Sequence, residues 1–260
     1  MSQITEHIRH SVVVAVFNES GNISQVVSEI FEVMAALGNT FEILIVNDGS
    51  YDGTGDRLRE LEATYYPHAI LIHFSDRCGQ SMALYAGFMA SRGEIILTID
   101  GDGQQSAADL HNLLDKLDEG YDLVVGKRVS RHDSFSKRAT SYFGNALRRK
   151  LLGDQIPDSG CSLRAFHRRS LQLLIPFHGL HRFLPSLIKM SGGRIASIPV
   201  SHFIRLSGRS KYGFFNRLIP VIVDITMLFL LRFRCFDLQN QEFRNPRTER
   251  SSNIFESIGS

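Results

Sequence analysis

The sequence of 260 residues has few cysteines, little net charge and no long apolar segment. Its three cysteines, Cys78, Cys161 and Cys235, are odd in number and lack the spacing of a metal site, which excludes a disulfide framework and favours a reducing compartment. No run reaches the ~18 uninterrupted apolar residues that cross a bilayer, so a polytopic membrane protein is excluded. Because residues 1–10 carry no apolar stretch, we expect no secretory signal.

The formal net charge of +2 is too small to indicate nucleic-acid binding, but the charges are unevenly distributed. Residues 123–153 contain eight Lys or Arg and a single acidic residue, Asp133. Residues 192–223 contain five Lys or Arg and no acidic residue. Acidic residues concentrate in the first half. We therefore expect one acidic edge suited to a cation and a basic surface suited to phosphate groups.

Apolar runs alternate with amphipathic segments in the first half of the chain. Buried strands are predicted at 12–17, 41–46, 69–74, 95–99 and 123–125. Helices are predicted from residue 22 onward, at 52–63 with Asp52 as the N-cap, at 81–91 and at 107–119. This alternation is typical of a parallel α/β sheet.

Polar residues follow the predicted strands where a parallel sheet binds its ligand, beyond the carboxyl ends of the strands. They are Asn18, Glu19, Asp48, Asp76, Asp100 and Asp102. Several carboxylates at one edge repel one another unless a cation or hydrogen-bond donors lie between them. The sequence therefore predicts a cation at this edge.

The turn after the first strand lacks Gly-x-Gly-x-x-Gly, which excludes a dinucleotide site of the Rossmann type. Asp100 and Asp102 are separated by one glycine at the end of an apolar strand. Two carboxylates at this spacing can bind one hard divalent cation that takes its other ligands from water and a diphosphate. The alternative is an ordinary capped turn before the next helix.

Seven motifs occur in order along residues 12–233. They are Val-Phe-Asn-Glu (16–19), Val-Asn-Asp-Gly-Ser-x-Asp-Gly-Thr (46–54), Gly-Gln-x-x-Ala-Leu-x-Ala-Gly (79–87), Asp-Gly-Asp-Gly-Gln (100–104), Asp-Ser-Gly-Cys (158–161), Arg-Phe-Leu-Pro (182–185) and Gly-x-Ser-Lys-Tyr-Gly (208–213). Together they resemble the family 2 glycosyltransferases, specifically the polyprenyl-phosphate glycosyltransferase branch that includes dolichyl-phosphate mannosyltransferase. The resemblance implies a GT-A fold, an α/β architecture with a Rossmann-like, mostly parallel sheet flanked by helices.

The resemblance also implies a donor site. Asn18, Glu19 and Asp48 would hold the base and ribose of a nucleotide sugar, although Asp48 could instead cap its own turn. Mg²⁺ or Mn²⁺, bridging the donor diphosphate, would be bound by Asp100, Asp102 and Gln104. Of these, Asp100 is also assigned to the donor and Asp102 is also counted as catalytic.

The acceptor implied by the resemblance is a polyprenyl phosphate. Its phosphate ligands would be Arg128, Lys137, Ser141 and Arg205. Arg209 and Lys211 are assigned to the donor diphosphate, but together with Arg205 they could bind either phosphate group. The resemblance implies that Asp158 is a catalytic residue, as base or as orienting group. The alternative is that it belongs to an ordinary Asx-turn.

The expected organisation is a GT-A domain at 1–205, a basic loop with an amphipathic helix at 206–233, and a polar, disordered tail at 234–260. The helix at 214–233 is predicted to lie in the headgroup region of a membrane, with a core helix as the alternative. We expect a peripheral protein on the cytoplasmic face of the membrane that binds no nucleic acid. A homo-oligomer or an integral-membrane partner is left open.

The function predicted from these residues is inverting, metal-dependent transfer of a hexosyl group from a UDP- or GDP-sugar to a polyprenyl phosphate. One alternative keeps the fold but uses a glycan hydroxyl as acceptor, which requires a general base, with Asp158 in that role. Another is a GT-A-fold binding subunit without catalytic activity.

Overall fold

The computed structural model describes residues 7–129, 156–158, 160–174, 176–203 and 215–232. For residues 215–221, 231 and 232 it describes the backbone only. Within these ranges the strands are β1 (His10–Val16), β2 (Phe41–Asn47), β3 (Ala69–His73), β4 (Ile95–Asp100), β5 (Leu123–Arg128), β6 (Arg164–His167) and β7 (Ile195–Val200). The helices are α1 (Ile23–Ala36), α2 (Thr54–Thr64), α3 (Gln80–Ala90), α4 (Asp109–Asp118), α6 (Leu180–Met190), α7 (Phe215–Arg232) and the 3-10 helix η1 (Arg168–Leu173).

The strands form one sheet in the order β3-β2-β1-β4-β6-β5-β7. Strand β6 is antiparallel to both of its neighbours, and the other described pairs are parallel. Every residue of β2 is buried, as expected for a central strand covered on both faces, which explains its continuous apolar sequence. The predicted α/β architecture with a mostly parallel sheet is confirmed.

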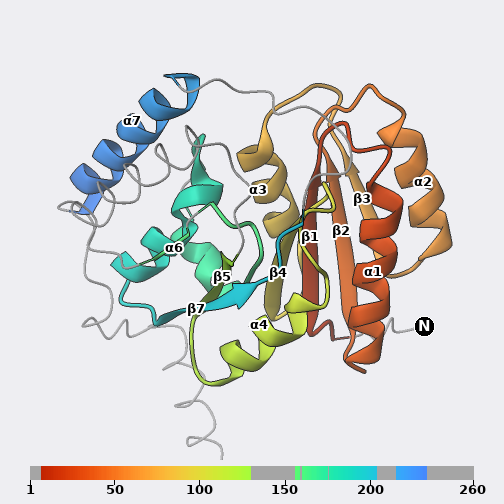
Figure 1. Ribbon diagram of the computed structural model, residues 1–260, viewed down its shortest axis with the longest axis horizontal. Helices are drawn as coiled ribbons and strands as arrows, with labels where there is room; N and C mark the ends of the chain where they lie inside the picture. The colour runs from red at the N-terminus through yellow and green to blue at the C-terminus, as the bar shows by residue number, and fades with distance from the viewer. Residues whose placement is uncertain (1–6, 130–155, 159, 175, 204–214, 233–260) are drawn as a thin grey trace, which may run out of the picture.

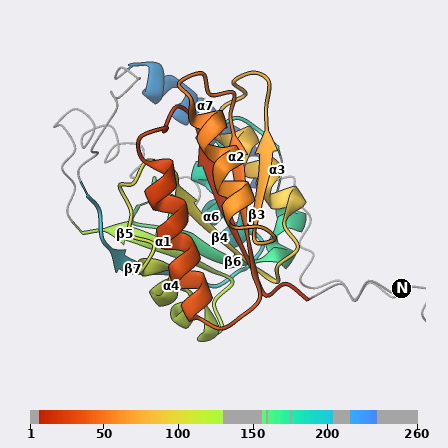
Figure 2. The same ribbon diagram turned by 90° about the vertical axis from the view of Figure 1, so that its right-hand side faces the viewer.

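Helices cover the sheet on both faces (Figure 1). Helices α1 and α2 pack against each other beside β2 and β3, and Figure 2 shows them side by side in front of the strands. Helix α3 contacts β1, β2 and α6, and α4 packs on β5, β6 and β7. The apolar residues of these helices join the strands in one large core.

One predicted helix cap is wrong by one residue. Gly53, with φ 86°, occupies the N-cap position of α2, because the chain enters the helix through a left-handed conformation that glycine adopts without strain. Asp52 lies one residue earlier, where its carboxylate accepts a hydrogen bond from the Thr54 amide at 3.1 Å. It therefore still satisfies an amide of the first helical turn.

The sheet brings the ends of β1, β2 and β4 to one edge. In the parallel register, Val16 pairs with Asn47 and Ala15 pairs with Asp100. The residues that follow these strands therefore lie side by side, which is the arrangement that the sequence predicts for the ligand site.

Helix α7 forms a smaller second core with α6. Ile225 and Leu228 of α7 are buried against apolar residues of α6, among them Phe183. Figure 1 shows α7, in blue, beside α6 at the side of the sheet remote from α1 and α2. The predicted helix is confirmed, with ends at Phe215 and Arg232. Among the described residues, no helix combines the length and the apolarity needed to span a bilayer.

Candidate active site

The loop after β4 carries the two carboxylates of the predicted cation site. Gly101 separates them, and a Cβ at this position would lie 2.9 Å from a methyl group of Val16 and 3.3 Å from one of Ile23. A larger residue would therefore push the loop away from β1 and α1. Asp102 then accepts a hydrogen bond from the Gln104 amide at 3.1 Å, which closes a tight turn.

Asp100 is held by residues from three separate segments. The side-chain amide of Gln80, at the start of α3, donates to Asp100 Oδ1 at 2.9 Å. Gln105 Oε1 accepts from the Asp100 backbone amide at 3.3 Å and from the Ser162 hydroxyl at 3.0 Å. Sequence reasoning did not assign these three residues. For Gln80 a signal existed, since it is the second residue of the Gly-Gln motif at 79–87.

The electrostatics of this loop fit a divalent cation. Burial, and then the neighbouring Asp102 carboxylate, raise the pKa of Asp100 from 3.8 to about 6, while a hydrogen bond from the Ser162 side chain and the charges of Arg164 and Arg128 oppose the shift. A buried carboxylate that is repelled by a neighbouring carboxylate is stabilised when a cation lies between the two. The described residues contain no group of three or more His, Cys, Asp or Glu side chains placed to hold a metal ion. Two carboxylates and one amide oxygen, from Asp100, Asp102 and Gln104, would leave a bound divalent cation to take its other ligands from a diphosphate and water.

Gln104 connects this loop to the chain that follows β7. Its side-chain nitrogen donates to the Phe203 carbonyl at 3.2 Å, and its own carbonyl accepts from the Phe203 amide at 2.8 Å. The side-chain nitrogen is a donor and is used in this way. The side-chain oxygen, which has the lone pairs, is the atom that would bind a cation.

Asn18 and Glu19 lie in the turn after β1 and hold it against the turn after β2. The Asn18 amide donates to Ser50 Oγ at 2.9 Å, and Asn18 Oδ1 accepts from the Tyr51 amide at 3.0 Å. The Glu19 amide donates to Thr54 Oγ1 at 2.9 Å. Asn18 has φ 54°, a left-handed conformation that asparagine tolerates better than most residues. The Asp48 amide donates to the Val16 carbonyl at 2.9 Å, so the turn with Asn18 and Glu19 and the turn with Asp48 start from the same place at the sheet edge.

Asp48 is 3 % exposed, and its carboxylate binds the loop that leads into α3. Oδ1 accepts from the Cys78 amide at 2.6 Å, and both oxygens lie 2.9 Å from the Gly79 amide. The carboxylate therefore holds a distant loop through these amides, 30 and 31 residues along the chain. Its role in binding base and ribose stays a prediction.

Arg128 and Asp158, which the sequence assigns to separate tasks, form a bidentate ion pair. Arg128 Nε donates to Oδ2 at 2.8 Å and Nη2 donates to Oδ1 at 3.0 Å. The pair is shielded, since the side chains of Arg128 and Asp158 are 17 % and 3 % exposed. It joins the end of β5 to the segment before β6, on the side of the sheet where β4 also ends. The roles of Arg128 at the acceptor phosphate and of Asp158 as base or orienting group stay predictions.

Comparison with known proteins identifies the family of this chain and solved structures with a similar fold. The family model described as "Glycosyl transferase family 2" matches residues 11–174. The chain belongs to this family. It is 34 % identical over 215 residues to an undecaprenyl-phosphate 4-deoxy-4-formamido-L-arabinose transferase of Klebsiella pneumoniae (strain 342). That alignment covers 83 % of this chain and 65 % of the relative, so the chain spans less than two thirds of the relative's length.

Solved structures establish the fold of this family 2 chain as GT-A. Mannosyl-3-phosphoglycerate synthase from Rubrobacter xylanophilus superposes with a TM-score of 0.66 and 18 % identity, over 92 % of this chain and 78 % of the other. Glucosyl-3-phosphoglycerate synthase from Mycobacterium tuberculosis, in complex with Mg²⁺ and UDP, gives a TM-score of 0.63 with 20 % identity. That match covers 84 % of this chain and 79 % of the other.

Five of the residues that the family resemblance assigns lie outside the described residues. They are Lys137, Ser141, Arg205, Arg209 and Lys211. The polar tail at 234–260 lies outside them as well. The described residues therefore include those predicted to bind the donor, the loop of Asp100 and Asp102 that is predicted to bind a cation, and the Arg128–Asp158 pair.

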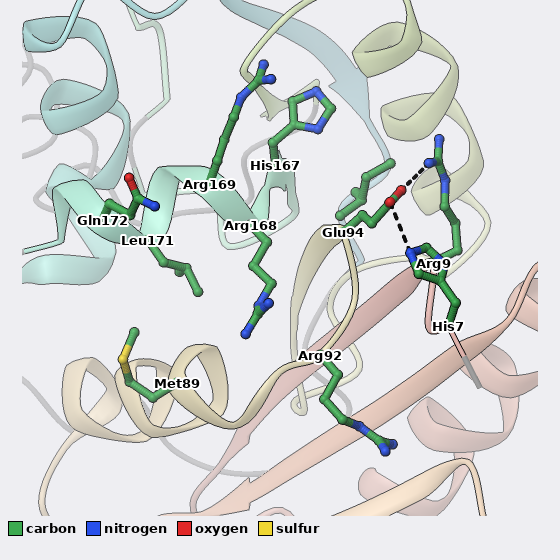
Figure 3. Close-up of a pocket in the computed structure, with 11 residues that line it drawn as sticks. His7, Arg9, Met89, Arg92, Glu94, His167, Arg168, Arg169, Leu171 and Gln172 are labelled. Atoms are coloured by element: carbon green, nitrogen blue, oxygen red, sulfur yellow. Dashed lines mark hydrogen bonds and ion pairs between the residues drawn. The ribbon is translucent and has the colours of Figure 1, made fainter. Parts of the chain in front are cut away.

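A cavity of about 880 Å³ lies at the opposite end of the sheet from the loop of Asp100 and Asp102. It opens beside Glu94 and Ile95 at the start of β4, whereas Asp100 ends that strand, about 16 Å away at the usual rise per residue. Its charges are largely paired, since Glu94 forms ion pairs with His7 and Arg9. In Figure 3 the side chains of the arginines that line it point in different directions, so they do not converge on one ligand position.

Proposed function

We propose that this chain transfers a hexosyl group from a UDP- or GDP-sugar to a polyprenyl phosphate, with inversion and with Mg²⁺ or Mn²⁺. The observation that carries the proposal is the carboxylate pair of Asp100 and Asp102 at the end of β4, whose mutual repulsion suits a cation bound to a diphosphate. The named activity of the Klebsiella relative supports the acceptor, and the Mg²⁺–UDP complex of a GT-A neighbour supports the donor.

In this proposal the chain's residues position two phosphate-bearing substrates. Asp100, Asp102 and Gln104 would hold the cation, which would supply Lewis-acid neutralisation of the charge on the leaving nucleoside diphosphate. Asn18, Glu19 and Asp48 would form the wall beside the base and ribose. Arg128, with Lys137, Ser141 and Arg205, would bind the acceptor phosphate.

With a phosphate acceptor, the protein has to align the two substrates but does not have to remove a proton from the acceptor. A phosphate oxygen is already anionic at neutral pH, so it can attack the anomeric carbon without prior removal of a proton. The new carbon–oxygen bond forms as the bond to the diphosphate breaks, and the diphosphate leaves with the electron pair. Alignment of the two groups then supplies most of the rate enhancement. The bidentate bond from Arg128 to Asp158 supports a positioning role for Asp158, because both carboxylate oxygens already accept hydrogen bonds.

A transfer assay tests the proposal. Purified protein is incubated with radiolabelled UDP- and GDP-sugars, undecaprenyl phosphate in detergent, and Mn²⁺ or EDTA. We expect label in the organic phase with one nucleotide sugar, and at least a hundredfold less with EDTA, since the cation supplies several kcal/mol of charge stabilisation. Label on a free glycan instead, together with inactivity of Asp158→Asn, would establish the hydroxyl-acceptor alternative.

We also propose that α7 rests in the headgroup region of the cytoplasmic face of the membrane and holds the site near its lipid acceptor. Supporting this, Val223 and Leu230 are each 60 % exposed, while Ile225 and Leu228 are buried against α6. An amphipathic helix with one apolar face packed on the protein and further apolar side chains in solvent suits an interface.

Vesicle flotation tests the role of α7. The Val223→Glu/Leu230→Glu double variant should bind anionic phospholipid vesicles about tenfold or more weakly, because two exposed apolar side chains that would enter the headgroup region are replaced by charges. Its melting temperature should stay near that of the wild type, since both side chains are exposed. Met89→Glu, on the exposed surface of α3, is the matched control and should float normally. Equal flotation of all three proteins would contradict the proposal.

A further inference from the structure

The first turn of α3 is fixed from two sides. On one side, the buried Asp48 carboxylate binds the amides of Cys78 and Gly79, immediately before the helix. Gly79 has φ 94°, a conformation that favours glycine, so the chain enters the helix at a sharply defined angle. The start of α3 is thereby attached to the end of β2.

On the other side, Ser81 attaches the same turn to α6. Its hydroxyl oxygen accepts from the Gly179 amide at 2.9 Å and lies 2.8 Å from His181 Nδ1. Burial lowers the pKa of His181 to about 3, so the imidazole is neutral and its Nδ1 can accept the Ser81 proton. Ser81 is 8 % exposed, which protects both bonds from competition with water.

Gln80 lies between these two attachments, and its side chain points to the loop that carries Asp100 and Asp102. Its amide nitrogen donates to Asp100 Oδ1 at 2.9 Å, across 20 residues of sequence. A hydrogen bond to one carboxylate oxygen restricts rotation of the carboxylate, and the Ser162 side chain also hydrogen-bonds this carboxyl group. The donor is neutral, so it orients Asp100 without adding a positive charge that would repel a cation.

We infer that Gln80 is a positioning residue for the cation site, held by the Asp48 and Ser81 attachments so that it orients the Asp100 carboxylate toward the cation. The inference rests on the proposed function, because it assigns Gln80 a task at the same cation. Glutamine fits this task through its length: asparagine is shorter by one methylene group, and glutamate has no amide proton to donate.

The experiment compares Gln80→Met with the wild type. Methionine has a similar length but cannot donate this hydrogen bond, and Gln80 is solvent-exposed, so folding should be unaffected. Binding of Mn²⁺ alone is measured from the electron paramagnetic resonance signal of the free ion, and the KM for Mn²⁺ and kcat are measured in the transfer assay. Gln25→Met, at an exposed glutamine of α1, is the matched control.

We expect Gln80→Met to bind Mn²⁺ about tenfold or more weakly, with a matching rise in the KM for Mn²⁺ and a smaller change in kcat at saturating Mn²⁺. Its melting temperature in EDTA should equal that of the wild type. Unchanged Mn²⁺ affinity, or a melting temperature lowered in EDTA, overturns the inference and leaves the proposed function intact. If the wild type neither binds Mn²⁺ nor requires it, the proposed cation fails, and the assignment of Gln80 fails with it.

Discussion

Replacing Asp102 with asparagine should lower sugar transfer by about a thousandfold or more while leaving the fold intact. The variant keeps the size of the side chain but removes one of the two negative charges that suit the loop to a cation. Loss of about 4 kcal/mol of charge stabilisation at the leaving diphosphate corresponds to this factor. The measurement is kcat at saturating donor and Mn²⁺, with Asp115→Asn, an exposed carboxylate of α4, as the control.

Stability in EDTA provides the second readout for this variant. The Asp102 carboxylate is one cause of the raised pKa of Asp100, so its removal should bring that pKa back toward 3.8. In the wild type, a folded-state pKa of about 6 means that the folded protein binds this proton more tightly than the unfolded chain. Stability without metal therefore falls as pH rises from 3.8 to about 6, and this fall should be smaller in Asp102→Asn. Wild-type transfer by the variant would refute the role of Asp102.

Removal of the Arg128 side chain should produce the largest loss of stability among the single substitutions at the site. Arg128→Ala deprives the Asp158 carboxylate, 3 % exposed, of a bidentate partner. Breaking a buried pair from one side costs about 3–5 kcal/mol, because the remaining charge stays desolvated. Arg128→Lys should recover only part of this, since an ammonium group cannot make the two parallel bonds. Urea denaturation measures both effects.

The exposed pair of Arg169 and Asp122 provides the control. Their side chains are 69 % and 27 % exposed, and the bond length is 2.8 Å. Arg169→Ala should cost at most about 1 kcal/mol, as is usual for surface ion pairs. The double variant Arg128→Met/Asp158→Leu should regain stability relative to Arg128→Ala without regaining activity. Equal losses for Arg128→Ala and Arg169→Ala would show that burial does not strengthen the first pair.

Strands β1 to β5 and the helices between them could be predicted from sequence because their signals are local. A parallel strand buried on both faces has a continuous apolar sequence, as in β2, and amphipathic helices such as α1 repeat their apolar positions regularly. Strands β6 and β7 carry weaker signals. Arg164 of β6 is buried because its guanidinium donates to the carbonyls of Cys161 and His181, and β7 is a partly exposed edge strand with Pro199.

For the site, the positions of residues at the strand ends could be predicted from the sequence, but the side-chain contacts between distant segments could not. Asp48 and Asp100 could be placed at one edge because parallel strands end together. The contacts of Gln80 and Ser162 could not, because they depend on side-chain directions between segments far apart in sequence. The Arg128–Asp158 pair escaped prediction for the same reason, since 30 residues separate its members.

The ion pair of Arg128 and Asp158 also joins two positions that lie 30 residues apart along the chain. Because β6 runs against β5, the chain leaves the sheet after Arg128 and returns to the same edge at Asp158. The described residues that flank the interval 130–155 are therefore linked directly to each other. The strand order of the sheet then does not depend on the length of this interval, because the link is made between residues on its two sides.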